Sequence, residues 1–230
     1  MQALPRVVQP AVAIKGVTEK FPVRRVFCVG RNYADHAKEM GASGREPPFF
    51  FLKPADTLFT VADGATADWP YPSLTQDLHH EVELVVAIGK DGKNIAVENA
   101  AQHIWGYAVG LDMTRRDLQA AMKKESKPWC IGKGFDHGAP IGPLVPIETT
   151  GELTAGPISL RVNGELKQQG DLSDLIWSIN EVIAHISKAW ELKAGDLIFT
   201  GTPAGVGAVN RGDTLMASAD RVGSFSLKVI

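Results

Sequence analysis

The sequence predicts a mainly β fold of the α+β class, in which many short strands are accompanied by a few helices. The 230-residue chain contains 23 glycines and 14 prolines, a composition typical of short strands joined by turns. Asn163-Gly164 separates two strand-like segments and is a strong hairpin signal, because both residues tolerate a positive φ. Only three segments have a helical pattern, and they do not alternate with strands as βαβ units do.

The expected strands are short apolar or alternating segments bounded by turn residues. In chain order they are Val7–Ala13, Arg25–Val29, Phe49–Lys53, Glu81–Ile88, Gly106–Leu111, Ser159–Val162, Leu197–Thr200, Thr214–Ala219 and Phe225–Val229. Glu165–Gln168 is expected to pair with Ser159–Val162 across the Asn163-Gly164 turn.

Three helices are expected among these strands. A short one covers Asn32–Met40 and ends at Gly41. Thr114 can cap a second helix that runs to about Lys124, where basic residues suit the helix dipole. The third, Ser173–Trp190, carries one apolar stripe and is expected to pack on a sheet.

Composition indicates one domain over residues 24–230, preceded by an N-terminal segment, residues 1–23. No internal repeat or low-complexity tract divides the chain. The formal net charge is only −2 and both signs are interspersed, so neither nucleic-acid binding nor a polybasic membrane patch is expected. No apolar run approaches the ~20 residues of a membrane span, and no signal-peptide pattern is present. Cys28 and Cys130 are too few for a disulfide framework, which favours a reduced, cytoplasmic setting.

Three acidic residues form a candidate metal site. Glu81 and Glu83 begin an apolar strand and point to the same face, about 6.6 Å apart along it. Their repulsion is roughly 0.6 kcal/mol in water but roughly 2.5 kcal/mol at an effective dielectric constant of about 20. Asp112 ends another buried strand. Alternatively, Glu81 and Glu83 lie on a solvated face of the strand, and Asp112 caps the following helix. If the three acids instead share a partly buried cleft, they need a cation.

The residue types in this cluster select a particular kind of ion. Carboxylates without a cysteine or histidine ligand pattern favour a hard cation, so one Mg2+ or Mn2+ is expected per chain. A dication leaves three carboxylates with a net negative charge, and Arg116 and Lys133 are the candidates to hold an anionic substrate. His79 and His80 leave a zinc-dependent hydrolase as a third alternative, although no H-E-x-x-H pattern accompanies them.

Two further features suggest catalysis and ligand binding. His36 and Glu39 lie three residues apart on the first expected helix and share a face, an arrangement that can activate water; a surface contact is the alternative. Thr202 lies in a Gly-rich loop after a strand, and its hydroxyl and the loop N–H groups could bind a carboxylate; a plain turn is the alternative. The loop lacks the phosphate-binding patterns, so a nucleotide is not expected.

An ordered set of motifs covers residues 24–229. They are VGRNYADHAKEM (29–40), FFLKP (50–54), HHEVELVV (79–86), GLDMTRRDLQ (110–119), WCIGKGFD (129–136), VNGEL (162–166) and FTGTPAGVG (199–207). In this order and spacing, the chain resembles the fumarylacetoacetate hydrolase family, in particular its small acylpyruvate hydrolase branch.

The resemblance implies a mixed β-sandwich roll, a homodimer, and a catalytic domain over residues 24–230. It implies that Mg2+ or Mn2+ is held by the three acids, that His36 and Glu39 activate water, and that a small 2-oxo acid is the substrate. It also implies substrate contacts for Lys133, Gln119 and Thr202, with Arg116 on the same helix as Gln119. Lys53 belongs to a shared motif without an assigned role.

The resulting hypothesis is a metal-dependent hydrolase of aromatic catabolism that cleaves the carbon–carbon bond of an acylpyruvate, with fumarylpyruvate as the preferred substrate. Lys133, with Gln119, would stabilise the oxyanion, and the metal would stabilise the leaving enolate. Oxaloacetate decarboxylation and oxo-dicarboxylate isomerisation are alternatives, because they use the same enolate chemistry. A non-catalytic metal- or carboxylate-binding module would not need His36 and Glu39. Arg31 or Arg45 could supply a cation for a fumaryl carboxylate.

Overall fold

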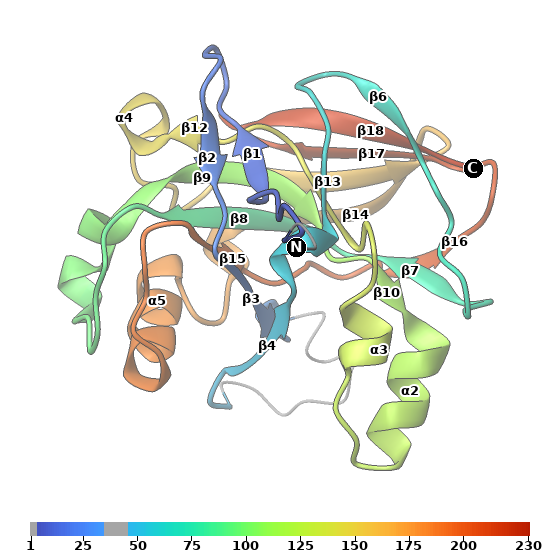
Figure 1. The fold of residues 1–230 in the computed structure, drawn as a ribbon, viewed down its shortest axis with the longest axis horizontal. Helices are drawn as coiled ribbons and strands as arrows, with labels where there is room; N and C mark the ends of the chain where they lie inside the picture. Colours follow the sequence, from blue (N-terminus) through green and yellow to red (C-terminus); the bar gives the residue numbers. More distant parts are fainter. Residues whose placement is uncertain (1–3, 35–45) are drawn as a thin grey trace.

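The computed structural model describes residues 4–34 and 46–230, and its strands dominate the architecture (Figure 1). The largest sheet has the order β4-β3-β15-β8-β9-β11-β5, and β12 pairs with β9. Its strands are β3 (Arg25–Gly30), β4 (Phe49–Lys53), β5 (Leu58–Thr60), β8 (Val82–Ile88), β9 (Ile104–Leu111), β11 (Ala139–Ile141), β12 (Val145–Pro146) and β15 (Asp196–Phe199).

A second sheet has the order β14-β13-β17-β18-β6. Its strands are β6 (Thr66–Trp69), β13 (Pro157–Val162), β14 (Glu165–Asp171), β17 (Thr214–Ala219) and β18 (Gly223–Val229). Two small sheets join β10 (Thr114–Arg115), β7 (Leu78–His80) and β16 (Gly207–Val209), and β1 (Ala11–Ala13) with β2 (Lys20–Pro22). Parallel pairs occur at β3–β15, β5–β11 and β6–β18 among antiparallel ones, so the expected mixed, mainly β fold is confirmed.

The helices of the described residues are few and short. They are α2 (Arg116–Lys124), α3 (Cys130–Lys133), α4 (Ile147–Thr150) and α5 (Ile179–Ala189), with 3-10 turns η1 (Ala55–Thr57), η2 (Val97–His103) and η3 (Leu172–Asp174). Figure 1 shows α2 and α3 side by side at one end of the molecule and α5 at the other. No helix in residues 4–34 and 46–230 is long and apolar enough to cross a lipid bilayer.

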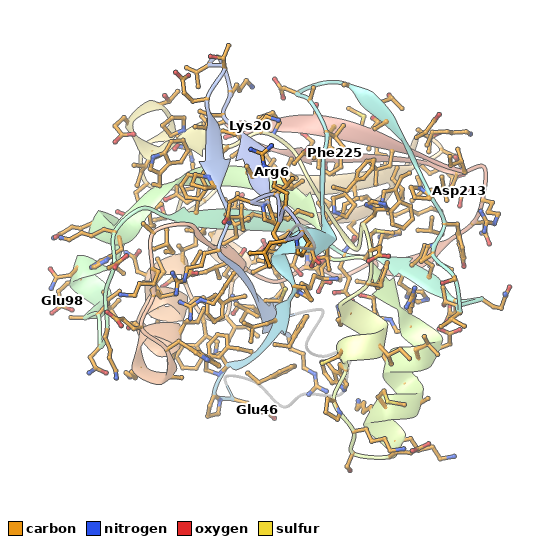
Figure 2. The ribbon with its side chains drawn as sticks, viewed as in Figure 1. Arg6, Lys20, Glu46, Glu98, Asp213 and Phe225 are labelled. Carbon is orange, nitrogen blue, oxygen red and sulfur yellow. The ribbon has the colours of Figure 1, made fainter. Side chains whose placement is uncertain are left out.

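Two apolar clusters lie on opposite faces of the large sheet. On one face, alternate residues of β8, such as Leu84 and Val86, pack against the five-stranded sheet and α5. On the other face, Val85 and Ala87 pack with the β1–β2 hairpin. In Figure 2 the side chain of Phe225 in β18 lies inside the first cluster, where it is 1% exposed. Because β8 is buried on both faces, its sequence reads as a continuous apolar run after Glu83.

Several local expectations are confirmed and three need correction. Asn163 and Gly164 have φ of 52° and 84°, as the predicted hairpin requires. The predicted strand Val7–Ala13 is shorter, because only its last three residues pair with β2. Thr114 does not cap α2: it lies in β10, and its hydroxyl donates to the Asp112 carbonyl oxygen.

The third correction concerns the long helix expected over Ser173–Trp190. The helix α5 begins only at Ile179, where Ser178 and Glu181 form a capping box. Leu175 instead forms an isolated bridge with Tyr33. The apolar stripe therefore extends beyond the helix, whereas the S-x-x-E pattern marks its true start.

Candidate active site

The antiparallel pairing of β8 with β9 brings the three acids together. Val82 pairs with Leu111, so the residues that precede and follow them, Glu81 and Asp112, are neighbours. The Asp112 N–H donates to the Glu81 carbonyl oxygen at 2.8 Å. One carboxylate oxygen from each of Glu81, Glu83 and Asp112 lies within 4.8 Å of the others, and all three residues are buried. The predicted cluster therefore exists as one group.

Three cationic side chains surround this carboxylate centre. The Lys133 ammonium donates to Glu81 Oε2 at 2.8 Å and to Asp112 Oδ2 at 2.7 Å. The Arg116 guanidinium donates to Glu81 Oε1 and, at 2.6 Å, to Gln119 Oε1. The Lys53 ammonium lies 2.8 Å from Asp112 Oδ1. Glu83 instead accepts a hydrogen bond from the Gly201 N–H at 2.7 Å.

These contacts give the buried groups opposite electrostatic behaviour. Burial raises the pKa of Glu81, but Lys133 and Arg116 outweigh it and hold that pKa far below its usual range. For Glu83, burial together with the charges of Asp112 and Glu81 raises the pKa well above its usual range. Burial alone would lower the pKa of Lys133, but the charges of Asp112 and Glu81 have the larger effect and raise it. The amine therefore stays protonated.

The donor set fits a hard divalent cation. Such ions bind oxygens at about 2.0–2.6 Å, so oxygens up to about 5 Å apart can share one ion. Glu81 and Asp112 contact cationic side chains, whereas Glu83 contacts a backbone N–H. A dication at this position would give Glu83 a cationic partner, and three carboxylates suit Mg2+ or Mn2+ better than a softer metal.

Lys53 is a part of the centre that the sequence did not assign. Its side chain is fully buried, and its ammonium donates to the carbonyl oxygens of Met113 at 3.1 Å, Gly138 at 3.0 Å and Lys133. It therefore ties the segments that carry Asp112 and Lys133 together. With Lys53, three cations balance the three carboxylates, so a bound dication would give the pocket a net positive charge. The expected anionic site is corrected in this respect.

Gln168 of β14 is a second residue that the sequence did not indicate. Its Oε1 accepts from the Val82 N–H at 3.1 Å and from His80 Nδ1 at 2.9 Å. Its Nε2 donates to Thr202 Oγ1 at 2.8 Å and to the Pro203 carbonyl oxygen at 2.9 Å. The Thr202 hydroxyl donates in turn to the Val82 carbonyl oxygen at 2.8 Å. The Thr202 proton is therefore already committed, and no local sequence pattern reveals this contact between two sheets.

A single cavity collects most of the predicted site residues. The cavity is lined by the predicted residues Glu81, Glu83, Asp112, Arg116, Gln119, Lys133 and Thr202, and also by Val29, Gly30, Arg31, Phe49, Phe51 and Trp129. Predicted residues His36, Glu39 and Arg45 lie outside the described residues.

The two histidines that left zinc as an alternative have protein partners. His79 Nε2 lies 2.8 Å from Asp77 Oδ1, and its Nδ1 accepts from Arg116 Nε at 3.4 Å. His80 binds Gln168. Neither imidazole belongs to the carboxylate group, so the geometry favours an all-oxygen ligand set.

The fold and the centre together define a mainly β protein with a buried site for a divalent cation. The family model described as "Fumarylacetoacetate (FAA) hydrolase C-terminal" matches residues 25–230. The chain belongs to the fumarylacetoacetate hydrolase family.

Proteins similar to this chain include fumarylpyruvate hydrolases and oxaloacetate tautomerases. The crystal structure of fumarylpyruvate hydrolase from Pseudomonas aeruginosa with Mn2+ and pyruvate is 52% identical, with a TM-score of 0.97 over 100% of this chain and 99% of that one. A fumarylpyruvate hydrolase of Ralstonia sp is 43% identical over 80% of this chain and 93% of its own. A mitochondrial oxaloacetate tautomerase of Rattus norvegicus is 42% identical over 90% of this chain and 91% of its own.

Proposed function

We propose that this protein is a metal-dependent acylpyruvate hydrolase that converts fumarylpyruvate and water into fumarate and pyruvate. The observation that carries the proposal is the cavity in which the carboxylate centre, Arg116, Gln119 and Lys133 meet. It is supported by the similarity to a fumarylpyruvate hydrolase that crystallised with Mn2+ and pyruvate. In the proposal Glu81, Glu83 and Asp112 hold Mg2+ or Mn2+, which supplies Lewis-acid stabilisation of the enolate that leaves.

The cations of the pocket orient and stabilise the substrate. Arg116 and Gln119 are joined by a hydrogen bond and lie beside Glu81, where they can hold the 2-oxo acid end of the substrate. Lys133 presents a buried ammonium, which stabilises the oxyanion formed when water attacks the distal carbonyl carbon. Thr202 contributes to the wall near Glu83, with its hydroxyl held by Gln168 and Val82.

Water activation is assigned to His36, oriented by Glu39. The imidazole removes a proton from water, the hydroxide oxygen bonds to the acyl carbonyl carbon, and the bond from that carbon to the pyruvate methylene breaks. The methylene carbon then takes up the proton, so one water yields a carboxylic acid and pyruvate. Replacing His36 with alanine should abolish hydrolysis while leaving metal affinity nearly unchanged, and an equal loss of metal affinity would contradict this role.

Oxaloacetate is the second candidate substrate. The similarity to an oxaloacetate tautomerase favours it, because enolisation of a 2-oxo acid needs the same metal and cationic groups but no attack by water. It would therefore depend on the carboxylate centre and not on water activation by His36.

A substrate panel tests the proposal. Fumarylpyruvate, acetylpyruvate and oxaloacetate are supplied with Mg2+ or Mn2+, and the loss of enol absorbance and the formation of pyruvate are followed. We expect the highest kcat/KM for fumarylpyruvate, no activity after chelation, and recovery on adding the metal. Activity in chelated protein, or turnover of oxaloacetate alone, would overturn the proposed hydrolase.

We also propose a homodimer that acts in the cytoplasm in aromatic catabolism. The exposed apolar side chains of Leu52 on the edge strand β4, and of Val7 and Val8, suit a contact between subunits. Light scattering after gel filtration should give twice the 24.8 kDa of one chain. A mass of one chain at micromolar concentration would contradict the dimer.

A further inference from the structure

We propose that Arg31, with the aromatic wall formed by Phe49, Phe51 and Trp129, is a subsite for a distal carboxylate. This subsite makes the pocket selective for acylpyruvates that carry a second acidic group. The inference rests on the proposed function and names the substrate class that the same cavity prefers. Arg31 and the aromatic wall line the same cavity as the carboxylate centre, and Lys133 Nζ lies 5.1 Å from the centroid of the Phe51 ring.

The register of β3 and β4 builds the wall. Gly30 pairs with Phe49, and an added Cβ at Gly30 would lie 2.0 Å from the Phe49 ring. Glycine is thus required for the ring to pack flat on the end of β3. Phe51, two residues along β4, points to the same face, and Trp129 meets both rings edge to face at centroid distances of 5.5 and 6.1 Å.

The Arg31 side chain lies over this wall. Arg31 adopts a left-handed conformation, with φ of 56°, which is uncommon for a residue other than glycine and concentrates at functional sites. Its guanidinium carbon lies 5.8 Å from the centroid of the Phe49 ring. The cation is therefore held over an aromatic face and remains partly exposed, where a ligand can reach it.

Arg31 differs from the other cations of the cavity in its charge balance. Lys53, Arg116 and Lys133 all contact Glu81 or Asp112. Within residues 4–34 and 46–230, no carboxylate forms an ion pair with Arg31. A guanidinium that is not paired with a protein carboxylate can bind the carboxylate of a ligand through two parallel hydrogen bonds.

The carboxylate centre and Arg31 offer partners for the two acidic groups of a dioxo-dicarboxylic acid. The 2-oxo acid end belongs at the carboxylate centre, where Arg116, Lys133 and a cation held by Glu81, Glu83 and Asp112 would offset its charge. The conjugated acyl chain is planar and apolar in its middle, which suits contact with Phe49, Phe51 and Trp129. Its far carboxylate then meets Arg31. An acyl group that lacks this carboxylate forgoes the contact with the guanidinium.

The test compares Arg31→Gln with wild-type protein on two substrates. We expect KM for fumarylpyruvate to rise about 10- to 100-fold, because a charged hydrogen-bond partner is lost, with a smaller change in kcat. The kcat/KM for acetylpyruvate should fall far less, so the preference between the substrates collapses. Arg31→Lys should restore part of the preference. Arg211→Gln is the matched control, because Arg211 also covers an aromatic ring, that of Tyr71, but does not line the cavity.

A binding experiment separates this inference from the proposed function. Isothermal titration of the Mn2+-loaded protein measures 2-oxoheptanedioate and 2-oxoheptanoate, which differ only in the distal carboxylate. Wild type should bind the diacid more tightly, and Arg31→Gln should bind both alike. Equal affinities in wild type, or an unchanged preference in Arg31→Gln, would overturn the subsite even if acylpyruvates are hydrolysed. Absence of hydrolysis with the diacid preference intact would overturn only the proposed function.

Discussion

At the scale of single residues, Glu83 combines a cost to stability with a function. Its buried carboxyl has a pKa well above the usual value of 4.5, first through burial and then through Asp112 and Glu81. A raised carboxyl pKa means that Glu83 contributes most to the stability of the metal-free fold at low pH, where this carboxyl is protonated. That stability is lost as the pH rises above the pKa of the unfolded chain toward the folded-state pKa. The centre is therefore built for a bound cation and not for the stability of the metal-free chain.

Glu83→Gln should separate these two roles. In chelator at pH 8, the free energy of unfolding in urea should equal or exceed that of wild type, because the amide is neutral and can still accept from the Gly201 N–H. The advantage should shrink toward pH 4.5. Metal affinity should fall by more than the about 10- to 100-fold typical of residues that only support a ligand. The control Glu165→Gln, at an exposed position, should change neither the stability nor the metal affinity. A loss of stability of Glu83→Gln in chelator would contradict this account.

Replacing Lys53 tests how much stability is lost when a cation that contacts the carboxylate centre is removed. Lys53→Met removes a buried ammonium that faces Asp112 and three carbonyl oxygens. Breaking a buried pair typically costs about 3–5 kcal/mol, so urea unfolding should show a loss of that order. Lys15→Met breaks the exposed pair with Asp63 and should cost less than about 1 kcal/mol. Similar losses in the two variants would show that Lys53 has no special part in the centre.

At the scale of elements, α5 shows which signals predict a boundary. Ser178 Oγ accepts from the Glu181 N–H, and the Glu181 carboxylate accepts from the Ser178 N–H. Ser178→Ala should therefore lower the free energy of unfolding by about 1 kcal/mol, whereas Ser178→Asp keeps an accepting oxygen and should lose much less. Thermal and urea unfolding of both variants measure the difference. Equal losses would mean that the cap does not set the start of α5.

The predicted strands are more accurate than the predicted helix starts, for a physical reason. Strand patterns such as Phe49–Lys53 and Thr214–Ala219 reflect local burial, and the structure reproduces both ranges. For Leu175 and Thr114, in contrast, a helical prediction follows only from their neighbours along the chain. Their positions are set by contacts with Tyr33 and with His79, which are distant in sequence.

At the scale of the whole molecule, the sequence predicted the acid cluster but not its support. Glu81, Glu83 and Asp112 could be found because strand periodicity and residue type are local. Lys53 and Gln168 could not, because one joins three segments and the other joins two sheets. The division of the chain after residue 23 stays a prediction, although Val12 and Phe21 pack on the large sheet.

The carboxylate centre joins the neighbouring strands β8 and β9 in the middle of the large sheet, so metal binding should stabilise the entire fold. A ligand present at 100 times its dissociation constant adds about 2.7 kcal/mol to the free energy of unfolding. For a chain of this size, that corresponds to a rise in Tm of about 5–10 °C. Thermal unfolding with and without Mn2+, after chelation, measures the shift. Asp112→Asn should reduce it strongly because it removes the charge of one ligand, and an unchanged shift in this variant would place the ion elsewhere.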